Sequence, residues 1–232
     1  MPAGKIYLAA PRRTSAPPRR RRIRRKRKYN KNKISTVLLR GPSLVPDRIL
    51  VKIKYFESLE FTGTGINYHS FRGNSFYDPD ESATGHQPLG FDQYAAFYNK
   101  YRVYGTKMKL RIVNNDSTQV DAALLASVGA FPTPTNFTEV CEQPYSVVKQ
   151  LGTVNANAKA VLKMYMSSSK IFGDKVKEDL DYAALVTASP AKVWRYQMYF
   201  TNYAPLDAIN VSALIEMEMY GEFFDRKELA QS

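Results

Sequence analysis

The sequence predicts an all-β fold, an antiparallel sandwich or barrel with short helices in its connections. Seven or eight segments alternate apolar and polar residues with a period of two, as half-buried strands do. The connections are long and polar, and the helical signals are too few to supply the crossover that each parallel strand pair needs. Sixteen Tyr and twelve Phe also suit β surfaces, on which aromatic side chains pack well.

The first predicted strand covers residues 49–55, where apolar side chains alternate with Lys52 and Lys54. Residues 62–90 are rich in Gly, Ser, Asn, Asp and Pro, and they predict a long loop between strands. Residues 91–101 space their apolar side chains at helical intervals behind Asp92, which suits an N-cap. A short helix is therefore expected before the next strand.

Residues 102–114 and 119–129 flank the turn-like sequence NNDS, and they predict a hairpin. Its first strand carries Lys107, Lys109 and Arg111 on the face opposite its apolar side chains. Residues 133–143 and 177–186 each predict a turn of helix inside a connection. The remaining strands are predicted at residues 146–152, 159–168, 192–203 and 209–224.

The charge of the chain is concentrated at its N-terminus. Residues 1–40 hold 15 of the 34 Lys and Arg and none of the 21 Asp and Glu, which leaves 19 cations against 21 carboxylates in residues 41–232. The N-terminal segment carries +15 and the remainder −2. We therefore expect two parts, a basic arm of residues 1–40 and a folded domain of residues 41–232.

The basic arm combines four prolines with its charge and shows no apolar periodicity, so it is expected to be disordered. Extended, its first 28 residues would reach on the order of 90–100 Å. Arg offers a planar fork of donors to phosphate and stacks on unpaired bases, which suits a single-stranded nucleic acid bound without sequence preference. The candidate nucleic-acid-binding residues are Arg12, Arg13, Arg19, Arg20, Arg21, Arg22, Arg24, Arg25, Lys26, Arg27, Lys28, Lys31 and Lys33.

The same run of cations is typical of a nuclear localisation signal, and import alone is the alternative function of the arm. Ten or more cations exceed what such a signal requires, which favours both roles together. For the strand cations two interpretations stay open, a solvated face or a basic lining against nucleic acid. These residues are Lys52, Lys54, Lys107, Lys109 and Arg111.

Catalytic motifs are scarce. The two histidines, His69 and His86, lie seventeen residues apart in the predicted loop, so the paired-histidine metal site of a strand-nicking nuclease has no counterpart. Cys141 is the only cysteine, which excludes an intramolecular disulfide and a four-cysteine zinc site. A buried, inert thiol is expected at Cys141, because a nucleophile would need a histidine nearby.

The remaining signals also argue against an enzyme. No glycine-rich phosphate-binding motif is present. The acidic segment EDLD predicts a solvated turn or helix start, with a cation site as the alternative; its carboxylates are Glu178, Asp179 and Asp181. No apolar run approaches the ~18 residues of a membrane helix, and the N-terminal apolar stretch is too short for a secretory signal. We expect an intracellular protein that has no enzyme activity, binds no cofactor or metal, and does not insert into membranes.

Two segments behind the arginine-rich arm closely resemble capsid proteins of circovirus-like viruses, which have small circular Rep-encoding single-stranded DNA genomes. They are GHQPLGFDQYAAFYNKYRVYGTKMKL (85–110) and EMEMYGEFFDRKEL (216–229). The resemblance implies an eight-stranded antiparallel jelly roll that assembles into a small T=1 icosahedral shell of sixty copies. It also implies an arm that binds packaged circular single-stranded DNA and host nuclear import receptors, and surface loops that attach to host glycans.

Two other classes of protein remain as rivals. A monomeric nucleic-acid-binding protein, ribosomal or architectural, would also carry a basic tail, but it would not self-assemble. A nucleic-acid enzyme is disfavoured by the missing histidine and metal motifs. The resemblance would place the protein in the virion, and in the host cell nucleus during assembly.

Overall fold

The computed structural model describes residues 45–82, 85–129, 134, 136–202 and 207–228, all within the compact unit Leu39–Ser232. The strands of the described residues are β1 (Arg48–Gly63), β2 (Asn67–Arg72), β3 (Tyr98–Asn114), β4 (Val120–Val128), β5 (Ser146–Leu151), β6 (Lys159–Ser167), β7 (Ala183–Leu185), β8 (Trp194–Asn202) and β9 (Ile209–Arg226). Short helical segments lie in the connections: α1 (Phe91–Phe97), α2 (Phe137–Cys141), α3 (Ser168–Phe172) and the 3-10 turn η1 (Leu180–Tyr182).

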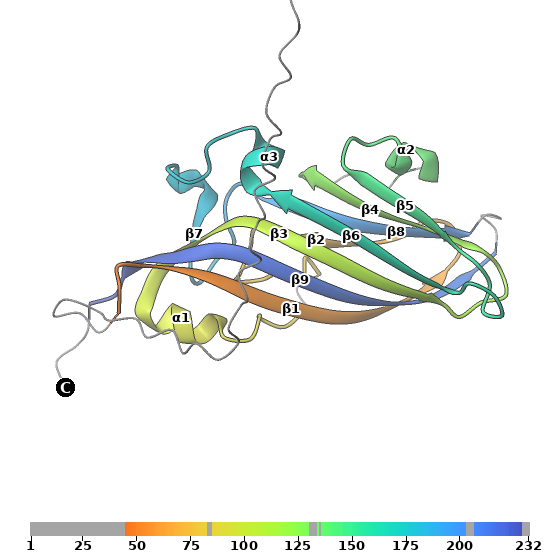
Figure 1. Ribbon diagram of the computed structural model, residues 1–232, viewed down its shortest axis with the longest axis horizontal. Helices are drawn as coiled ribbons and strands as arrows, with labels where there is room; N and C mark the ends of the chain where they lie inside the picture. The colour runs from red at the N-terminus through yellow and green to blue at the C-terminus, as the bar shows by residue number, and fades with distance from the viewer. Residues whose placement is uncertain (1–44, 83–84, 130–133, 135, 203–206, 229–232) are drawn as a thin grey trace, which may run out of the picture. The chain divides into compact units, whose positions relative to one another are not determined.

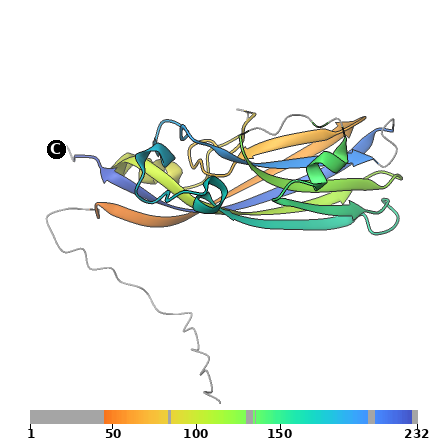
Figure 2. The ribbon, with the colours of Figure 1, turned by 90° about the horizontal axis from the view of Figure 1, so that it is seen from above.

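The strands form two antiparallel sheets that pack as two layers (Figures 1 and 2). The first sheet has the order β1-β9-β3-β6, with short β7 also paired to β3, and the second has the order β2-β8-β4-β5. The pairing is nested, because β1 pairs with β9, β2 with β8, β3 with β6 and β4 with β5. This arrangement is an eight-stranded jelly roll with one extra strand. The predicted all-β fold class is confirmed.

Three details of the prediction are wrong. The predicted hairpin at residues 102–129 is a crossover, since β3 and β4 belong to different sheets. Its turn is held by the Asn114 side chain, which donates to the carbonyls of Thr118 (2.6 Å) and Gly152 (2.8 Å). The predicted loop at residues 62–90 contains β2, and the helix predicted to reach Tyr101 ends at Phe97 because β3 begins at Tyr98. In each case pairing with a distant strand overrides local propensity.

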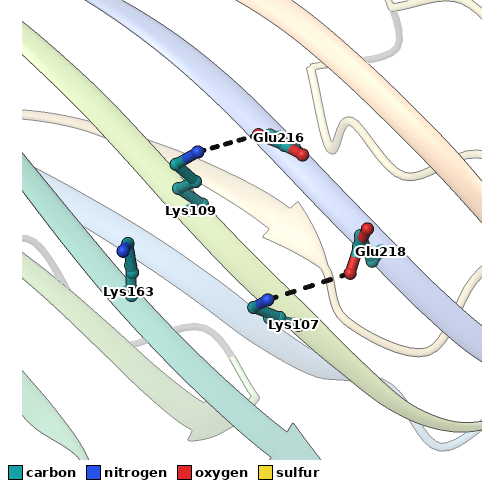
Figure 3. Close-up of a pocket in the computed structure, with 5 residues that line it drawn as sticks. All are labelled: Lys107, Lys109, Lys163, Glu216 and Glu218. Carbon is teal, nitrogen blue, oxygen red and sulfur yellow. Dashed lines mark ion pairs between the residues drawn. The ribbon is translucent and has the colours of Figure 1, made fainter. Parts of the chain in front are cut away.

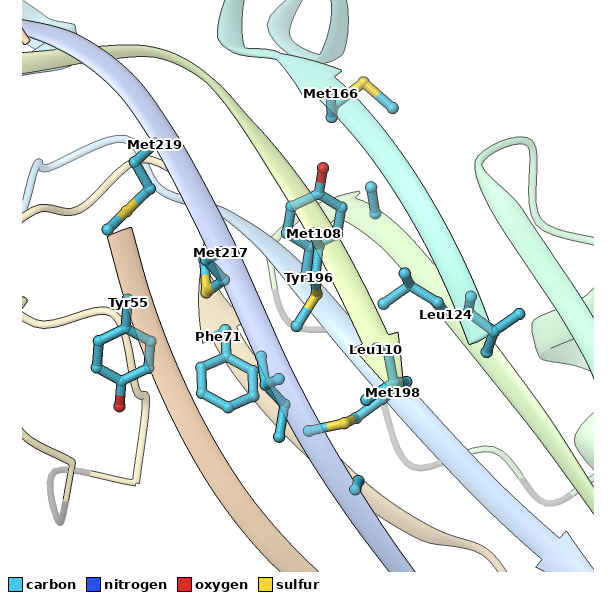
Figure 4. Close-up of a cluster of buried hydrophobic side chains, with 14 of the residues drawn as sticks. Tyr55, Phe71, Met108, Leu110, Leu124, Met166, Tyr196, Met198, Met217 and Met219 are labelled. Atoms are coloured by element: carbon cyan, nitrogen blue, oxygen red, sulfur yellow. The ribbon is translucent and has the colours of Figure 1, made fainter. Parts of the chain in front are cut away.

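The core lies between the sheets and is built from the apolar face of each strand. Met108, Leu110 and Met217 of the first sheet meet Tyr196 and Met198 of the second (Figure 4). All five side chains are fully buried, and the Tyr196 hydroxyl donates to the carbonyl of Thr106 at 2.7 Å. The alternation that the sequence predicted is therefore confirmed for residues 107–112, with the cations on the opposite face.

The outer faces of the two sheets differ. Ala123, Leu125 and Tyr199 of the second sheet are fully buried under Val140 of α2 and its neighbours. The outer face of the first sheet instead presents exposed lysines and arginines. None of the helices in the described part of the chain has the length and hydropathy that crossing a membrane requires.

A buried ion pair joins β3 to β9. Arg102 and Glu222 lie 3.2 Å apart with side chains only 3% and 6% exposed. The same guanidinium donates to the carbonyls of Lys177 (2.5 Å) and Asp179 (3.0 Å), which fastens the connection before η1 to the sheet. Arg48 approaches Glu222 from β1 at 3.7 Å.

Candidate nucleic-acid interface

The first sheet carries a group of cations interleaved with aromatic and acidic side chains on its outer face. Even-numbered residues of β1 and β9 and odd-numbered residues of β6 share this face, because side chains alternate along each strand and the strands pair in register. The odd-numbered residues of β3 join them from Gly105 onward, after the register shift between Val103 and Gly105. We call this surface the basic face. It comprises Lys52, Lys54, Phe56, Lys107, Lys109, Arg111, Lys163, Tyr165, Leu214, Glu216, Glu218 and Tyr220.

Strand register arranges these residues in rows across the sheet. Lys54, Glu218, Lys107 and Tyr165 form one row, and the next consists of Phe56, Glu216, Lys109 and Lys163. Neighbouring strands lie about 4.8 Å apart, so directly opposite side chains are in reach of one another. The central strand β9 supplies both carboxylates, and the cations lie on its two sides.

Five cations share the two carboxylates. Glu218 pairs with Lys52 (2.8 Å), Lys54 (3.5 Å) and Lys107 (3.9 Å). The second carboxylate, Glu216, pairs with Lys109 (3.5 Å) and Arg111 (3.1 Å).

The sixth cation, Lys163, borders the same shallow hollow as Lys107 and Lys109 (Figure 3). It has no carboxylate partner among the described residues. Six cations against two carboxylates give the basic face a charge of +4.

This charge is segregated from the rest of the domain. Residues 41–232 as a whole carry −2, so the residues of that segment outside the basic face carry −6. A surface of +4 on a slightly acidic body would attract a polyanion.

The protonation of the basic face follows from its ion pairs. The ammonium group of Lys52 donates to Glu218, and this hydrogen bond lowers the pKa of Glu218 from 4.5 to about 2, against the opposing effect of desolvation. The Tyr220 hydroxyl also donates to Glu218 at 3.2 Å. The same contact with Glu218 raises the pKa of Lys52. Both groups therefore stay charged at neutral pH.

The lowered pKa predicts a specific loss of stability in acid. Glu218 stabilises the fold above pH 4.5, and this contribution is lost as the pH falls toward about 2. The unfolding midpoint of the wild type should therefore drop more steeply between about pH 5 and pH 2 than that of Glu218→Gln, as measured by urea unfolding at each pH. Glu60→Gln, an exposed glutamate of β1, is the control. Equal pH dependence of the wild type and Glu218→Gln would contradict the prediction.

The sequence matches no protein-family model and no curated protein. Several solved structures of viral origin are similar to the chain. One is from Desmodium yellow mottle tymovirus, at 13% identity and a TM-score of 0.44, covering 86% of this chain and 100% of that one. Another is the 60-mer of the capsid protein of BFDV, at 11% identity and a TM-score of 0.43, covering 81% and 100%.

A third similar structure is a semi-empty virus-like particle of the Macrobrachium rosenbergii nodavirus, at 9% identity and a TM-score of 0.44, covering 82% of this chain and 100% of that one. The jelly-roll assignment rests on the strand order and the nested pairing of this chain.

The candidate residues of the arm, from Arg12 to Lys33, all lie outside the described residues, as does the expected boundary at residue 40. Their role in nucleic-acid binding and import stays a prediction. The strand cations are described, and the structure brings all five of them together on one face.

Lys163 and Tyr165 were missed as candidates. The period-two pattern of residues 159–168 shows that they share a face, but only the pairing of β6 with β3 places that face beside the other cations.

The histidines are separated by structure and form no paired site. His69 lies in β2 rather than in a loop, and its Nε2 is 2.8 Å from the buried carboxylate of Asp80. His86 stacks on Tyr55 with ring centroids 4.7 Å apart, and its Nδ1 is 3.3 Å from Glu57. Both rings therefore attach the segment after β2 to the sheets.

Cys141 is exposed at the end of α2, which corrects the expectation of a buried thiol. Desolvation by neighbouring atoms, with the charge of Asp121, raises its pKa, so the unreactive thiol form is favoured.

The acidic segment begins η1, as one of its two interpretations predicted. The Asp179 side chain accepts from the backbone N–H of Asp181, and Asp181 pairs with Lys192 at 3.2 Å. In the part of the chain that the structure describes, no three potential metal ligands cluster.

Proposed function

We propose that this chain is the capsid protein of a circovirus-like virus, a structural protein without enzyme activity. It self-assembles into a T=1 icosahedral shell of sixty copies and packages circular single-stranded DNA through the basic arm, with RNA as an alternative cargo in recombinant particles. The observation that carries the proposal is the division of charge, +15 on residues 1–40 and −2 on a jelly-roll body.

The positive charge of the arms supports the proposal, because it would offset the phosphate charge of a packaged strand. In a shell of sixty copies the arms would supply about 900 positive charges, which offset a similar number of phosphates. Without a polyanion the arms would repel one another. A nearly neutral body lets copies pack side by side without long-range repulsion.

We also propose a route for the protein in the cell. The arginine-rich run of the arm would bind host import receptors and bring the protein to the nucleus, where assembly takes place. The mature location would be the virion. Loops between the strands would form the outer surface and attach to host glycans.

Size-exclusion chromatography and electron microscopy of the purified full chain test the proposal. We expect large, closed particles at neutral pH and moderate salt, with an absorbance ratio that reports bound nucleic acid. A persistent monomer would overturn the assembly proposal. If that monomer bound one defined RNA or DNA, the protein would instead be a ribosomal or architectural nucleic-acid-binding module.

A further inference from the structure

The basic face differs from an ordinary solvated sheet surface because it also exposes aromatic rings. Tyr165 is 58% exposed and Phe56 is 42% exposed, although both are large side chains on regular strands. On the outer face of the second sheet, α2 buries Ala123, Leu125 and Tyr199, whereas no described segment buries the rings of Tyr165 and Phe56. Because the two rings lie on β1 and β6, three strands apart, their exposure does not by itself mark a binding surface, and only the cations beside them indicate one.

Each exposed ring lies beside cations. Tyr165 is directly opposite Lys107 in the paired strand, and Lys163 is its neighbour on the same face of β6. Phe56 follows Lys54 on the same face of β1 and lies opposite Glu216. Proteins that bind single-stranded nucleic acids commonly place an aromatic ring next to a cation. A base stacks on the ring, and the neighbouring phosphate binds the cation.

The carboxylates of the basic face help to define the ligand. Glu216 and Glu218 lie in the same rows as the rings and cations, so a ligand that is charged along its whole length, with no uncharged group to place beside these carboxylates, would meet repulsion there. A sulfated polysaccharide is such a ligand. A nucleotide chain alternates a charged phosphate with an uncharged base, which matches a surface where cations alternate with rings.

We propose that the basic face is a second contact surface for single-stranded nucleic acid, on which bases stack on Tyr165 and Phe56 and phosphates pair with Lys107 and Lys163. This inference rests on the proposed packaging function and adds a surface distinct from the arm. Binding there would be independent of sequence, because every base has a face that can stack. In an assembled shell the first sheet would then face the packaged strand.

Crosslinking of the full chain to an oligothymidylate of about 20 nucleotides that contains 4-thiothymidine tests the location, since a strand of that length exceeds the site size of a single binding domain. After irradiation and tryptic digestion, we expect adducts on the peptides of β6 and β1 as well as on the arm. Adducts confined to residues 1–40 would overturn the second surface and leave the packaging proposal intact. If the wild-type chain bound no oligonucleotide, the proposed function itself would fail.

A substitution tests the stacking. Tyr165→Leu removes the ring but keeps an apolar side chain, and it should weaken oligothymidylate binding about 5-fold, the loss expected for one stacked base. Tyr68→Leu is the matched control, because Tyr68 is 48% exposed on β2 of the other sheet. Equal affinities of the two variants would overturn the proposal. An equal loss of heparin binding by Tyr165→Leu would show a general polyanion surface and would overturn it as well.

Discussion

Replacing Glu222 with glutamine is expected to lower the free energy of unfolding by about 3–5 kcal/mol, the cost of leaving one partner of a buried ion pair without its counter-charge. Arg102 is 2% exposed, and after the change it still donates to the carbonyls of Lys177 and Asp179. Its guanidinium also lies over the ring of Phe224, 5.1 Å from the ring centroid. These contacts orient the guanidinium but do not neutralise it, because none of them carries a negative charge. Arg48, which also approaches Glu222, loses its partner too.

Urea unfolding of the unassembled protein measures the effect. Glu216→Gln is the matched control: this glutamate lies on the same strand and pairs with Arg111, whose side chain is 43% exposed. An exposed pair contributes roughly 0–1 kcal/mol, so the control should unfold nearly as the wild type does.

The double variant Arg102→Met, Glu222→Leu removes both charges and should recover most of the lost stability. A loss below about 1 kcal/mol in Glu222→Gln would show that the pair is not needed to neutralise Arg102.

Replacing the nine cations of residues 19–28 with glutamine is expected to abolish the packaging of nucleic acid while the jelly roll still folds. For a single strand, every phosphate that is no longer neutralised by a cation should make the slope of log K against log salt shallower by about 0.7. If all nine cations bind phosphates, the slope for oligothymidylate binding changes by about 6. The described core contains none of these residues, so the unfolding midpoint should stay unchanged.

The control keeps the charge and changes the side chain. Lysine at the seven arginine positions of the same run should preserve the salt slope, and particles should still contain nucleic acid by their absorbance ratio. Loss of nucleic acid in this control would show that the guanidinium geometry, rather than the charge, carries the binding. An unchanged slope in the glutamine variant would contradict a role of the arm in binding.

The strand predictions succeeded where one face of a strand is buried and the other is solvated. Residues 106–114 and 209–220 alternate cleanly because these parts of β3 and β9 each pack one face into the core. The alternating pattern is absent from β2, in which Phe71 is the only fully buried residue of six. Such a strand is held by its pairing with β8, which is more than a hundred residues away in the chain.

The sequence by itself determined the all-β class, most strand positions and the division of charge, because these depend on local periodicity and composition. Only the tertiary structure decided which strands pair, since the energy of pairing comes from partners far apart in the chain. Because of this strand pairing, the predicted hairpin is a crossover, and Arg102 lies beside Glu222, which is 120 residues away in the chain. It also assembled the basic face from four strands, none of which carries more than three of its six cations.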